Sequence, residues 1–329
     1  MPAVNSKIVQ ADYNSIRDKV VAVLGNGSGN SGYGQQARLA STAVNENSRV
    51  TINEWANLRF DIINAYKHIN GSNPTTAVVA EGDTIRYTSS FTPDTGSLDV
   101  PQTQYDVWAD NITTNRFTIA PSESGTTAIT TSSKTTAWVS QCECVIQFYW
   151  TNANDARYWF NSGGRIRISA SRSGGALGTQ QNTSWTSLLS AAGTQNFGGA
   201  FPNTSLVTSP NDGTNWYRTT NAFQTFYTAQ ATGAYTSNTY RLQARCVDVP
   251  SNSAGTAVSG EIRVLFTDGY TDSGAIGPPA LNPPPGDDID GTLTVSVSTL
   301  FAANSIMVPG SAVFTVTQPT IAVGAVTGS

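Results

Sequence analysis

The residues best suited to hold a metal ion are three cysteines and a single histidine. Cys142, Cys144 and Cys246, together with His68, would form a Cys3His set, one of the ligand combinations of structural zinc sites. Only one residue separates Cys142 from Cys144, whereas the paired cysteines of such sites are spaced more widely. Because apolar residues such as Ile146 share their phase, we predict small buried thiols, with zinc binding as the alternative.

The remaining candidates for acid–base or cation chemistry are His68 and the acidic residues. His68 falls at the end of a predicted helix, where we expect a surface residue or a residue of the last turn rather than a catalytic base. Asp287, Asp288 and Asp290 offer oxygen ligands for calcium, but the glycine and glutamate of an EF-hand loop are missing, so we prefer a solvated turn. A glycosidase would need two converging carboxylates, and the acidic residues are scattered over predicted loops.

A glycine-rich tract at residues 25–34 imitates a nucleotide-binding loop. Gly27, Gly29 and Gly32 match the GxGxxG pattern, which functions between a strand and a helix. The apolar residues before the tract follow helical spacing instead, and no further βαβ unit follows, so we predict a flexible connector. The sequence contains no GxSxG, HExxH or GxxxxGK motif. We therefore predict no catalytic, cofactor-binding or metal-binding residues, and a protein that is not an enzyme.

Tryptophan offers one further kind of chemistry, the stacking of sugar rings. Such side chains more often fill cores and subunit interfaces, so we prefer that interpretation and keep a sugar-binding platform as the alternative. The tryptophans considered are Trp108, Trp138, Trp150, Trp159, Trp185 and Trp216.

Two helices are predicted near the N-terminus, within a helical docking unit at residues 1–75. Asp12 caps the first and Gly25 ends it, and one stripe is apolar: Tyr13, Ile16, Val20, Val23 and Leu24. Thr51 and Glu54 form a capping box at the start of the second, whose apolar face comprises Trp55, Leu58, Ile62, Ala65 or Tyr66, and Ile69. A unit this small holds few core residues, so we expect it to pack on other protein.

Residues 141–172 predict two strands of a half-buried sheet. Apolar and polar residues alternate at 141–148, and Ile166 and Ile168 alternate with arginines after a glycine turn that Tyr158 and Phe160 lead into. Two arginines of a local basic cluster then belong to the outward side of the second strand; the cluster comprises Arg157, Arg165, Arg167 and Arg172.

Further short strands follow from the same period, with polar connections between them. They are predicted at 84–90, 104–108, 116–119, 137–150, near Trp216, and at 223–227, 240–249 and 261–268. Residues 121–136 are predicted to be a polar loop. The long excursion at 174–203 is expected to be an Ω-loop or subunit-contacting arm with one helical turn near Trp185, and a substrate lid is the alternative.

A proline-rich stretch at 274–291 separates the last predicted strands from the rest. The tail alternates at 292–297 and at 313–317, but it is too short to fold alone and must add to the main sandwich, to the helical unit or to a neighbouring chain. We therefore predict a mainly β chain: an antiparallel β-sandwich or jelly-roll at 76–277, a small N-terminal helical unit, and a proline-rich linker with C-terminal strands at 278–329.

Composition narrows the class of partner. Of the 329 residues only 12% are charged, and the net charge of −4 with a pI near 5.0 argues against a nucleic-acid-binding protein. The N-terminus lacks the apolar core of a signal peptide, and no apolar run is long enough to span a bilayer. We expect neither nucleic-acid binding nor membrane insertion, and reduced thiols are consistent with assembly in a cytoplasm.

Five segments, in order along nearly the whole chain, carry a resemblance to a known family. They are YNSIRDKVVAVLGNGSGNSGYGQ, VTINEWANLRFDIINAYKHING, ARYWFNSGGRIRISASRSGG, NTSWTSLLSAAGTQNFGG and DGTLTVSVSTL. The chain resembles virion structural proteins of contractile-tailed bacteriophages, especially marine and cyanobacterial ones. The resemblance implies a non-enzymatic component of the tail, neck, baseplate or fibre apparatus, and it brings no catalytic residues with it.

We accordingly expect a structural virion subunit, assembled in the host cytoplasm as a symmetric homo-oligomer. Its expected partners are other copies of itself and other virion proteins, because the helical unit and the C-terminal strands are each too small to be self-sufficient. A carbohydrate-binding receptor module that recognises a host surface glycan is the alternative, and a depolymerase acting on envelope sugar is a third hypothesis. No cofactor is expected.

Overall fold

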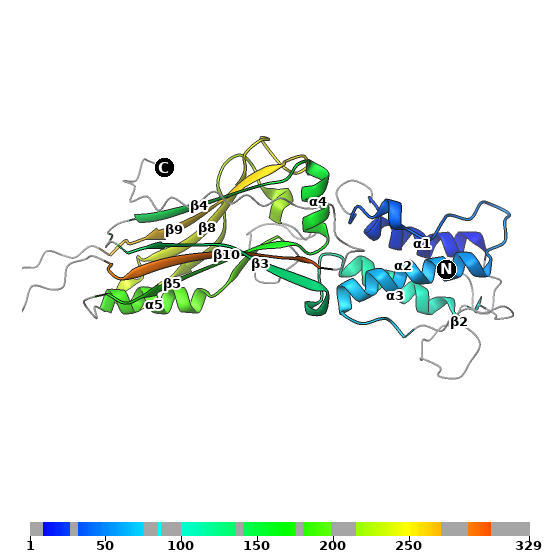
Figure 1. The fold of residues 1–329 in the computed structure, drawn as a ribbon, viewed down its shortest axis with the longest axis horizontal. Coiled ribbons are helices and arrows are strands. Elements are labelled where there is room, and N and C mark those ends of the chain that lie inside the picture. Colours follow the sequence, from blue (N-terminus) through cyan, green and yellow to red (C-terminus); the bar gives the residue numbers. More distant parts are fainter. Residues whose placement is uncertain are drawn as a thin grey trace, which may run out of the picture. The chain divides into compact units, whose positions relative to one another are not determined.

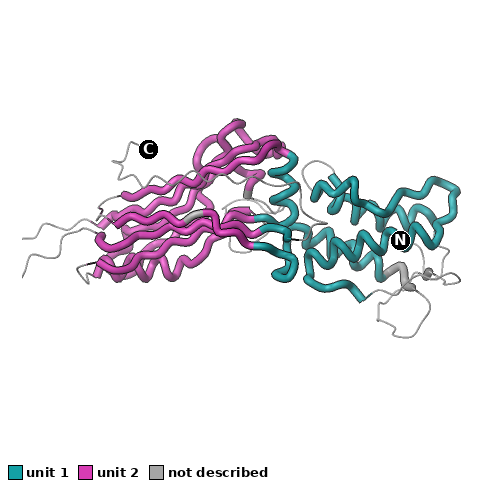
Figure 2. The backbone as a smooth tube through the Cα atoms, viewed as in Figure 1, with its two compact units in different colours: residues 1–125, 154–164, 301–311 teal, residues 126–153, 165–300, 312–329 magenta. Residues whose placement is uncertain are grey.

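The computed structural model describes the chain in two compact units. The described residues are 9–26, 32–75, 85–86, 100–135, 138, 141–175, 180–198, 215–270 and 289–303. Unit 1 comprises Met1–Gly125, Asn154–Gly164 and Phe301–Ser311, and unit 2 comprises Thr126–Ala153, Arg165–Leu300 and Ala312–Ser329 (Figure 2). The described residues form five α-helices and two four-stranded sheets, so the chain is a mixed α and β protein rather than a mainly β one.

Helix α1 (Gln10–Leu24) opens unit 1 and buries the stripe that its spacing predicts. The helix starts one turn earlier than Asp12, because Val9 is the N-cap and the Asp12 carboxylate accepts a hydrogen bond from the Val9 N–H (3.0 Å). At its end, the Gly25 N–H donates to the Val21 carbonyl (2.8 Å), which confirms the predicted stop. The buried residues are Tyr13, Ile16, Val20, Val23 and Leu24.

Helix α2 (Ile52–Asn70) also follows its sequence signals. The predicted capping box is present at Thr51 and Glu54, and Gly71 closes the helix with a φ of 79°, a conformation that favours glycine. Trp55 makes edge-to-face contacts with Tyr13 of α1 and Tyr105 of α3, both at 5.3 Å between ring centroids. These aromatic contacts join the three long helices of unit 1 into one core.

Helix α3 (Gln102–Thr114) corrects the strand predicted at 104–108. Tyr105, Trp108, Ala109 and Ile112 are all buried, and their spacing of three and four residues is helical. A five-residue window is too short to distinguish this spacing from strand alternation. A parallel two-residue pair, β1 (Ile85–Arg86) with β2 (Val100–Pro101), precedes the helix.

Helix α4 (Ala153–Asn161) stands where Tyr158 and Phe160 were expected to lead directly into a turn. Its buried residues include Ala156, Trp159 and Phe160, which again follow helical spacing. The strand predicted at 116–119 is also wrong, because those residues form a turn and irregular chain. Short 3-10 turns complete the unit: η1 (Gln36–Arg38) and η2 (Pro121–Glu123).

The first sheet of unit 2 has the strand order β3-β10-β5-β6. Its strands are β3 (Ser124–Lys134), β10 (Thr292–Ala302), β5 (Arg165–Ser173) and β6 (Gln195–Phe197). β10 pairs antiparallel with β5 from Thr292 opposite Ser173 to Leu300 opposite Arg165. The first tail strand therefore joins the main sheet, as one of the expected placements had it (Figure 1). The alternating run at 313–317 lies outside the described residues.

Strand β3 replaces the polar loop predicted at 121–136. The segment is rich in threonine, whose branched side chain favours strands, and its hydroxyls pair with those of β10. Thr131 lies 3.4 Å from Ser296 and Ser133 lies 3.0 Å from Thr294, measured between hydroxyl oxygens. Hydrophobic periodicity does not detect this strand, because hydroxyl pairs and main-chain hydrogen bonds stabilise it instead of apolar side chains.

The second sheet has the order β4-β9-β8-β7, with antiparallel pairing throughout. Its strands are β4 (Gln141–Tyr149), β9 (Ser259–Thr267), β8 (Thr239–Cys246) and β7 (Gln224–Gln230). These confirm the strands expected in those regions, except that Trp216 lies in a 3-10 turn, η3 (Asn215–Arg218). A register shift between Thr225 and Tyr227 marks a bulge in β7.

Aromatic side chains fill the space between the two sheets. Phe148 of β4 contacts Phe197 of β6 at 6.1 Å between centroids, and Phe197 contacts Phe226 of β7 at 5.3 Å. Helix α5 (Gln180–Ala192) packs along β5 (Figure 1), and it is a full helix where a single turn was expected near Trp185. Trp185, 1% exposed, anchors it to Trp138 at 5.2 Å.

Candidate functional site

His68 lies in the last turn of α2, as one part of its prediction stated, but it is buried rather than on the surface. Its side chain is 0% exposed, and its Nε2 donates to the Ser162 carbonyl at 2.9 Å. Desolvation lowers the pKa of His68 to about 4, although this hydrogen bond and the charge of Glu123 act in the opposite direction. A neutral, enclosed imidazole of this kind joins α2 to the end of α4 and does not reach solvent as a base.

The three cysteines are free thiols and fully buried, which confirms their predicted role as core side chains. Burial raises the pKa of Cys142 to about 11 and that of Cys144 to about 12. Thiols with such a pKa are poor nucleophiles, because nucleophilic attack needs the thiolate. No group of three or more His, Cys, Asp or Glu side chains arranged to hold a metal occurs within the described residues.

The tryptophans are all internal. The exposed fraction of the seven side chains runs from 0% for Trp216 to 7% for Trp108, so none presents a ring face to a sugar. Trp150, Trp216 and Phe148 form a closed cluster with centroid distances of 5.4 to 5.7 Å. This placement confirms the core interpretation and removes the tryptophan platform as a candidate site.

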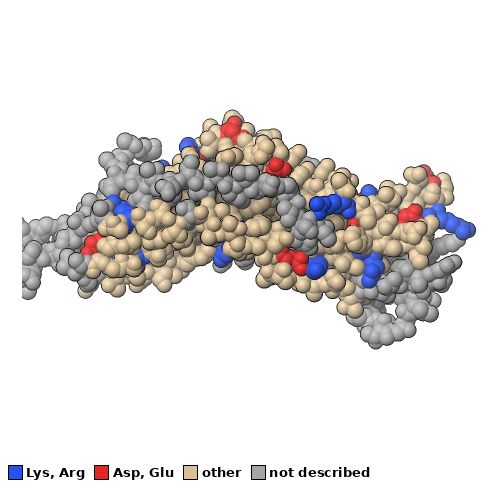
Figure 3. All heavy atoms as spheres, viewed as in Figure 1, with Lys and Arg blue, Asp and Glu red and all other residues tan. Residues whose placement is uncertain are grey.

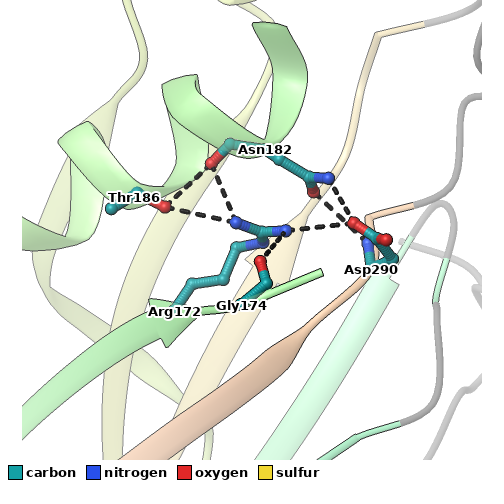
Figure 4. A network of polar contacts seen from close by, with 5 residues as sticks. All are labelled: Arg172, Gly174, Asn182, Thr186 and Asp290. Carbon is teal, nitrogen blue, oxygen red and sulfur yellow. Dashed lines mark hydrogen bonds and ion pairs between the residues drawn. The ribbon is translucent and has the colours of Figure 1, made fainter. Parts of the chain in front are cut away.

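Arg172 lies at the centre of a polar cluster, shown in Figure 4. Its guanidinium donates to Asp290 (3.1 Å), to the Gly174 carbonyl (3.2 Å) and to Asn182 and Thr186 of α5 (3.4 and 3.3 Å). The Asn182 amide also donates to Asp290. The cluster ties β5, α5 and the start of β10 together, so we interpret it as a structural clamp.

Burial of the arginines differs from expectation. Arg172 is 8% exposed and Arg165 is 5% exposed, so Arg165 is not on a wetted strand face. Burial lowers the pKa of Arg172, while the Asp290 carboxylate acts to raise it. Asp290 is therefore a partner for a buried cation rather than part of a solvated turn. Asp287 and Asp288 of the same predicted turn lie outside the described residues. Gly27 and Gly29 of the glycine-rich tract also lie outside them.

The outer face of the second sheet carries a ladder of charges that neutralise one another. Glu261 accepts from Arg245 (2.7 Å) and from the Gln147 amide (2.8 Å), and Arg263 donates twice to the Gln243 carbonyl oxygen (2.7 and 3.0 Å). The guanidinium carbons of Arg245 and Arg263 lie 4.5 and 4.4 Å from the centroid of the Phe223 ring. These groups are occupied with one another and form a stable polar surface.

Two hollows open on unit 2. One of about 260 Å3 is framed by Tyr149 and Val247, which are 45% and 48% exposed, with Gln147, Ser259 and Glu261 around it. The other, of about 430 Å3, runs between α5 and β7. The Ser259 hydroxyl at the smaller hollow donates to the Asp248 carboxylate (2.9 Å), and neither hollow is lined by a histidine or a cysteine.

Unit 1 instead exposes apolar side chains on its helices. Phe60 and Ile52 of α2 are 51% and 39% exposed, and Val107 of α3 is 46% exposed. Ala56 is exposed and Ile63 half-buried on the same side of α2, so the helix has a second apolar face opposite its buried one. We call Ile52, Ala56, Phe60 and Ile63 the outer stripe.

Charges are sparse on the face of the molecule that Figure 3 displays. None of the helices that the structure describes is both long and apolar enough to cross a bilayer. Comparison with known proteins gives no match to a family model, to a curated protein or to a solved structure.

Proposed function

We propose that this chain is a structural subunit of a tailed-phage virion, placed in the neck, tail, baseplate or fibre apparatus. It assembles as a symmetric homo-oligomer, contacts other virion proteins and performs no catalysis. The observation that carries the proposal is the outer stripe of α2, where Ile52 and Phe60 are large, apolar and exposed, because exposed apolar patches are typical of protein interfaces. The buried histidine and thiols add support, since these chemically reactive side chains pack in the core.

The outer stripe has the properties of a surface that meets its own copy. Its four residues recur at spacings of three and four, and the exposed residues beside them include the uncharged Asn53 and Asn57. A two-fold interface brings identical residues together, so it tolerates apolar and amide groups but not a row of like charges. Ala56, between Ile52 and Phe60, leaves room for a partner's aromatic ring.

The proposal extends to the finer classification of unit 2 as a jelly-roll type of sandwich. Its first strand pairs with its last, β3 with β10, and its second with its second last, β4 with β9. Nested pairing of this kind is typical of jelly-rolls, which are common in capsid proteins. The inner strands pair in sequence order, β5 with β6 and β7 with β8, so the nesting is incomplete.

Sedimentation of the purified chain tests the proposal, together with the copy number of the chain on particles. We expect an oligomer that Phe60→Glu dissociates and that the matched variant Ala43→Glu, at an exposed position outside α2, leaves assembled. A stable monomer that is also missing from particles would overturn the proposal.

A host-glycan receptor remains the second candidate, supported by the hollow at Tyr149. An exposed aromatic ring beside amide and carboxylate groups is a common sugar-binding arrangement. A glycan array read with the intact chain and with Tyr149→Ala decides it. Binding that disappears in the variant supports the receptor role, and an array without signal ends it.

A further inference from the structure

The hollow between α5 and β7 has the form of a groove beside a sheet edge. Leu188, Ala191 and Ala192 line it from α5, and Tyr227 and Ala229 line it from β7. The rest of its lining is serine, threonine, glutamine and one more alanine, without a single charged side chain. A surface of small uncharged groups excludes a charged ligand and accepts a close-fitting neutral chain.

Strand β7, which lines this groove, also forms the edge of its sheet. It is the last strand in its sheet, with β8 on one side and no described strand paired to its other edge. An edge strand presents a row of N–H and C=O groups that can pair with another extended segment. The groove therefore suits a β-strand, which gains main-chain hydrogen bonds from β7 and side-chain packing from α5.

The chain itself contains a segment with matching chemistry after its last described residue. Residues 304–329 carry no charged side chain, and the run at 310–318 is bounded by Pro309 and Pro319. Within that run Ala312, Phe314 and Val316 occupy alternate positions, as one face of a strand requires. Its nine residues would extend roughly 30 Å, which is enough to cover the seven residues of β7.

We propose that the run at 310–318 docks as an added strand on β7, in the groove beneath α5 of its own chain. The segment begins a few residues after Ala303, which directly follows β10, so it is covalently attached to the chain whose strand it would pair with. A short tether gives an effective concentration in the millimolar range, which favours docking within one chain over capture from another. The docking applies to a monomer as well as to an assembled subunit, so its failure and a failure of self-association are separate results.

Amide hydrogen exchange on the full-length chain tests this docking. Ala191→Arg fills the groove from an exposed position on α5, and Phe314→Asp places a charge on the apolar side of the segment. We expect each variant to speed the exchange of β7 amides that do not pair with β8 by about tenfold. The double variant should show no further increase, because both changes break one interaction.

Matched variants separate docking from general damage. Ser190→Arg adds the same charge on α5 outside the groove lining, and Thr315→Asp adds a charge on the other side of the segment; both should leave β7 exchange unchanged. The amides of β8 and β9 should keep their wild-type rates in all variants. Unchanged β7 exchange in Ala191→Arg and Phe314→Asp would overturn the proposal. Protection of β7 that falls on dilution would overturn docking within one chain, because it assigns the strand to a second copy.

Discussion

The outer face of the second sheet in unit 2 and the exposed side of α2 in unit 1 carry different kinds of side chain. On the outer face of the second sheet, Arg245 donates to Glu261 and Arg263 donates to Gln243, and both guanidiniums also contact the Phe223 ring. Helix α2 of unit 1 leaves Phe60 and Ile52 in contact with solvent. A face whose polar groups are already satisfied gains little from a partner, whereas an apolar face gains from one. The comparison supports the proposed contacts at the outer stripe of unit 1, although Tyr149 and Val247 of unit 2 are exposed to a similar degree.

The largest effect is expected from the core of unit 2. Phe148→Ala removes a ring that contacts Phe197, Trp150 and Trp216, so it should lower the free energy of unfolding of unit 2 by about 3–5 kcal/mol. Denaturant titration followed by tryptophan fluorescence measures this loss. If the two units are energetically separate, the helical signal of unit 1 should keep its midpoint. A common shift of both signals would contradict the separation.

The next effect concerns pH and unit 1. The folded pKa of His68 is lowered to about 4 from an ordinary value of 6.5, so the unfolded state takes up a proton first as the pH falls. Stability should therefore be fully present above pH 6.5 and decrease by up to about 3 kcal/mol as the pH falls to 4. His68 is the sole histidine, so His68→Gln should flatten the dependence in that interval. An unchanged slope in the variant would show that carboxylates cause it.

A smaller effect should follow from opening the Arg172 clamp. Asp290→Ala leaves a buried guanidinium without its carboxylate, and because the Asp290 side chain is 23% exposed we expect a loss of about 2 kcal/mol. Thermal unfolding of unit 2 measures it. Asp248→Ala is the comparison, since that exposed carboxylate accepts bonds from Val258 and Ser259 and pairs with no buried cation. An equal loss in both variants would argue against a special role for the clamp.

The smallest expected effect lies at the start of α2. Thr51→Ala removes one half of the capping box and should destabilise unit 1 by about 1 kcal/mol. Circular dichroism during thermal unfolding measures this change. Thr51→Ser, which keeps the hydroxyl, should restore most of the stability, and its failure to do so would assign the effect to the lost methyl group.

Local signals in the sequence predicted what local physics determines. The helices α1 and α2 have caps and stripes within a few residues, and β8 alternates polar and apolar residues over its full length. Strand β3 escaped prediction because its hydroxyl partners lie on β10, more than 160 residues later. Helix α3 was mistaken for a strand because Tyr105 and Trp108 were considered without Ile112.

The predicted exposure of two candidate site residues, His68 and Asp290, was wrong for the same reason. His68 looks like a surface residue until Ser162, 94 positions away, accepts its hydrogen bond. Asp290 looks like part of a turn until Arg172, 118 positions earlier, takes it as a partner. Burial of these groups depends on distant segments, and a single sequence does not show which of them meet. The predicted burial of the thiols was correct because their apolar strand neighbours already indicated it.

The position of β10 has a consequence for the order of synthesis. This strand lies between β3 and β5, so the first sheet of unit 2 has a gap in its interior until residue 302 has left the ribosome. Until β10 is synthesised, the edges of β3 and β5 that it pairs with have no partner strand. A chain truncated before residue 292 would leave those edges unpaired and prone to aggregation. Completion of the nascent chain is therefore the step that seals this sheet.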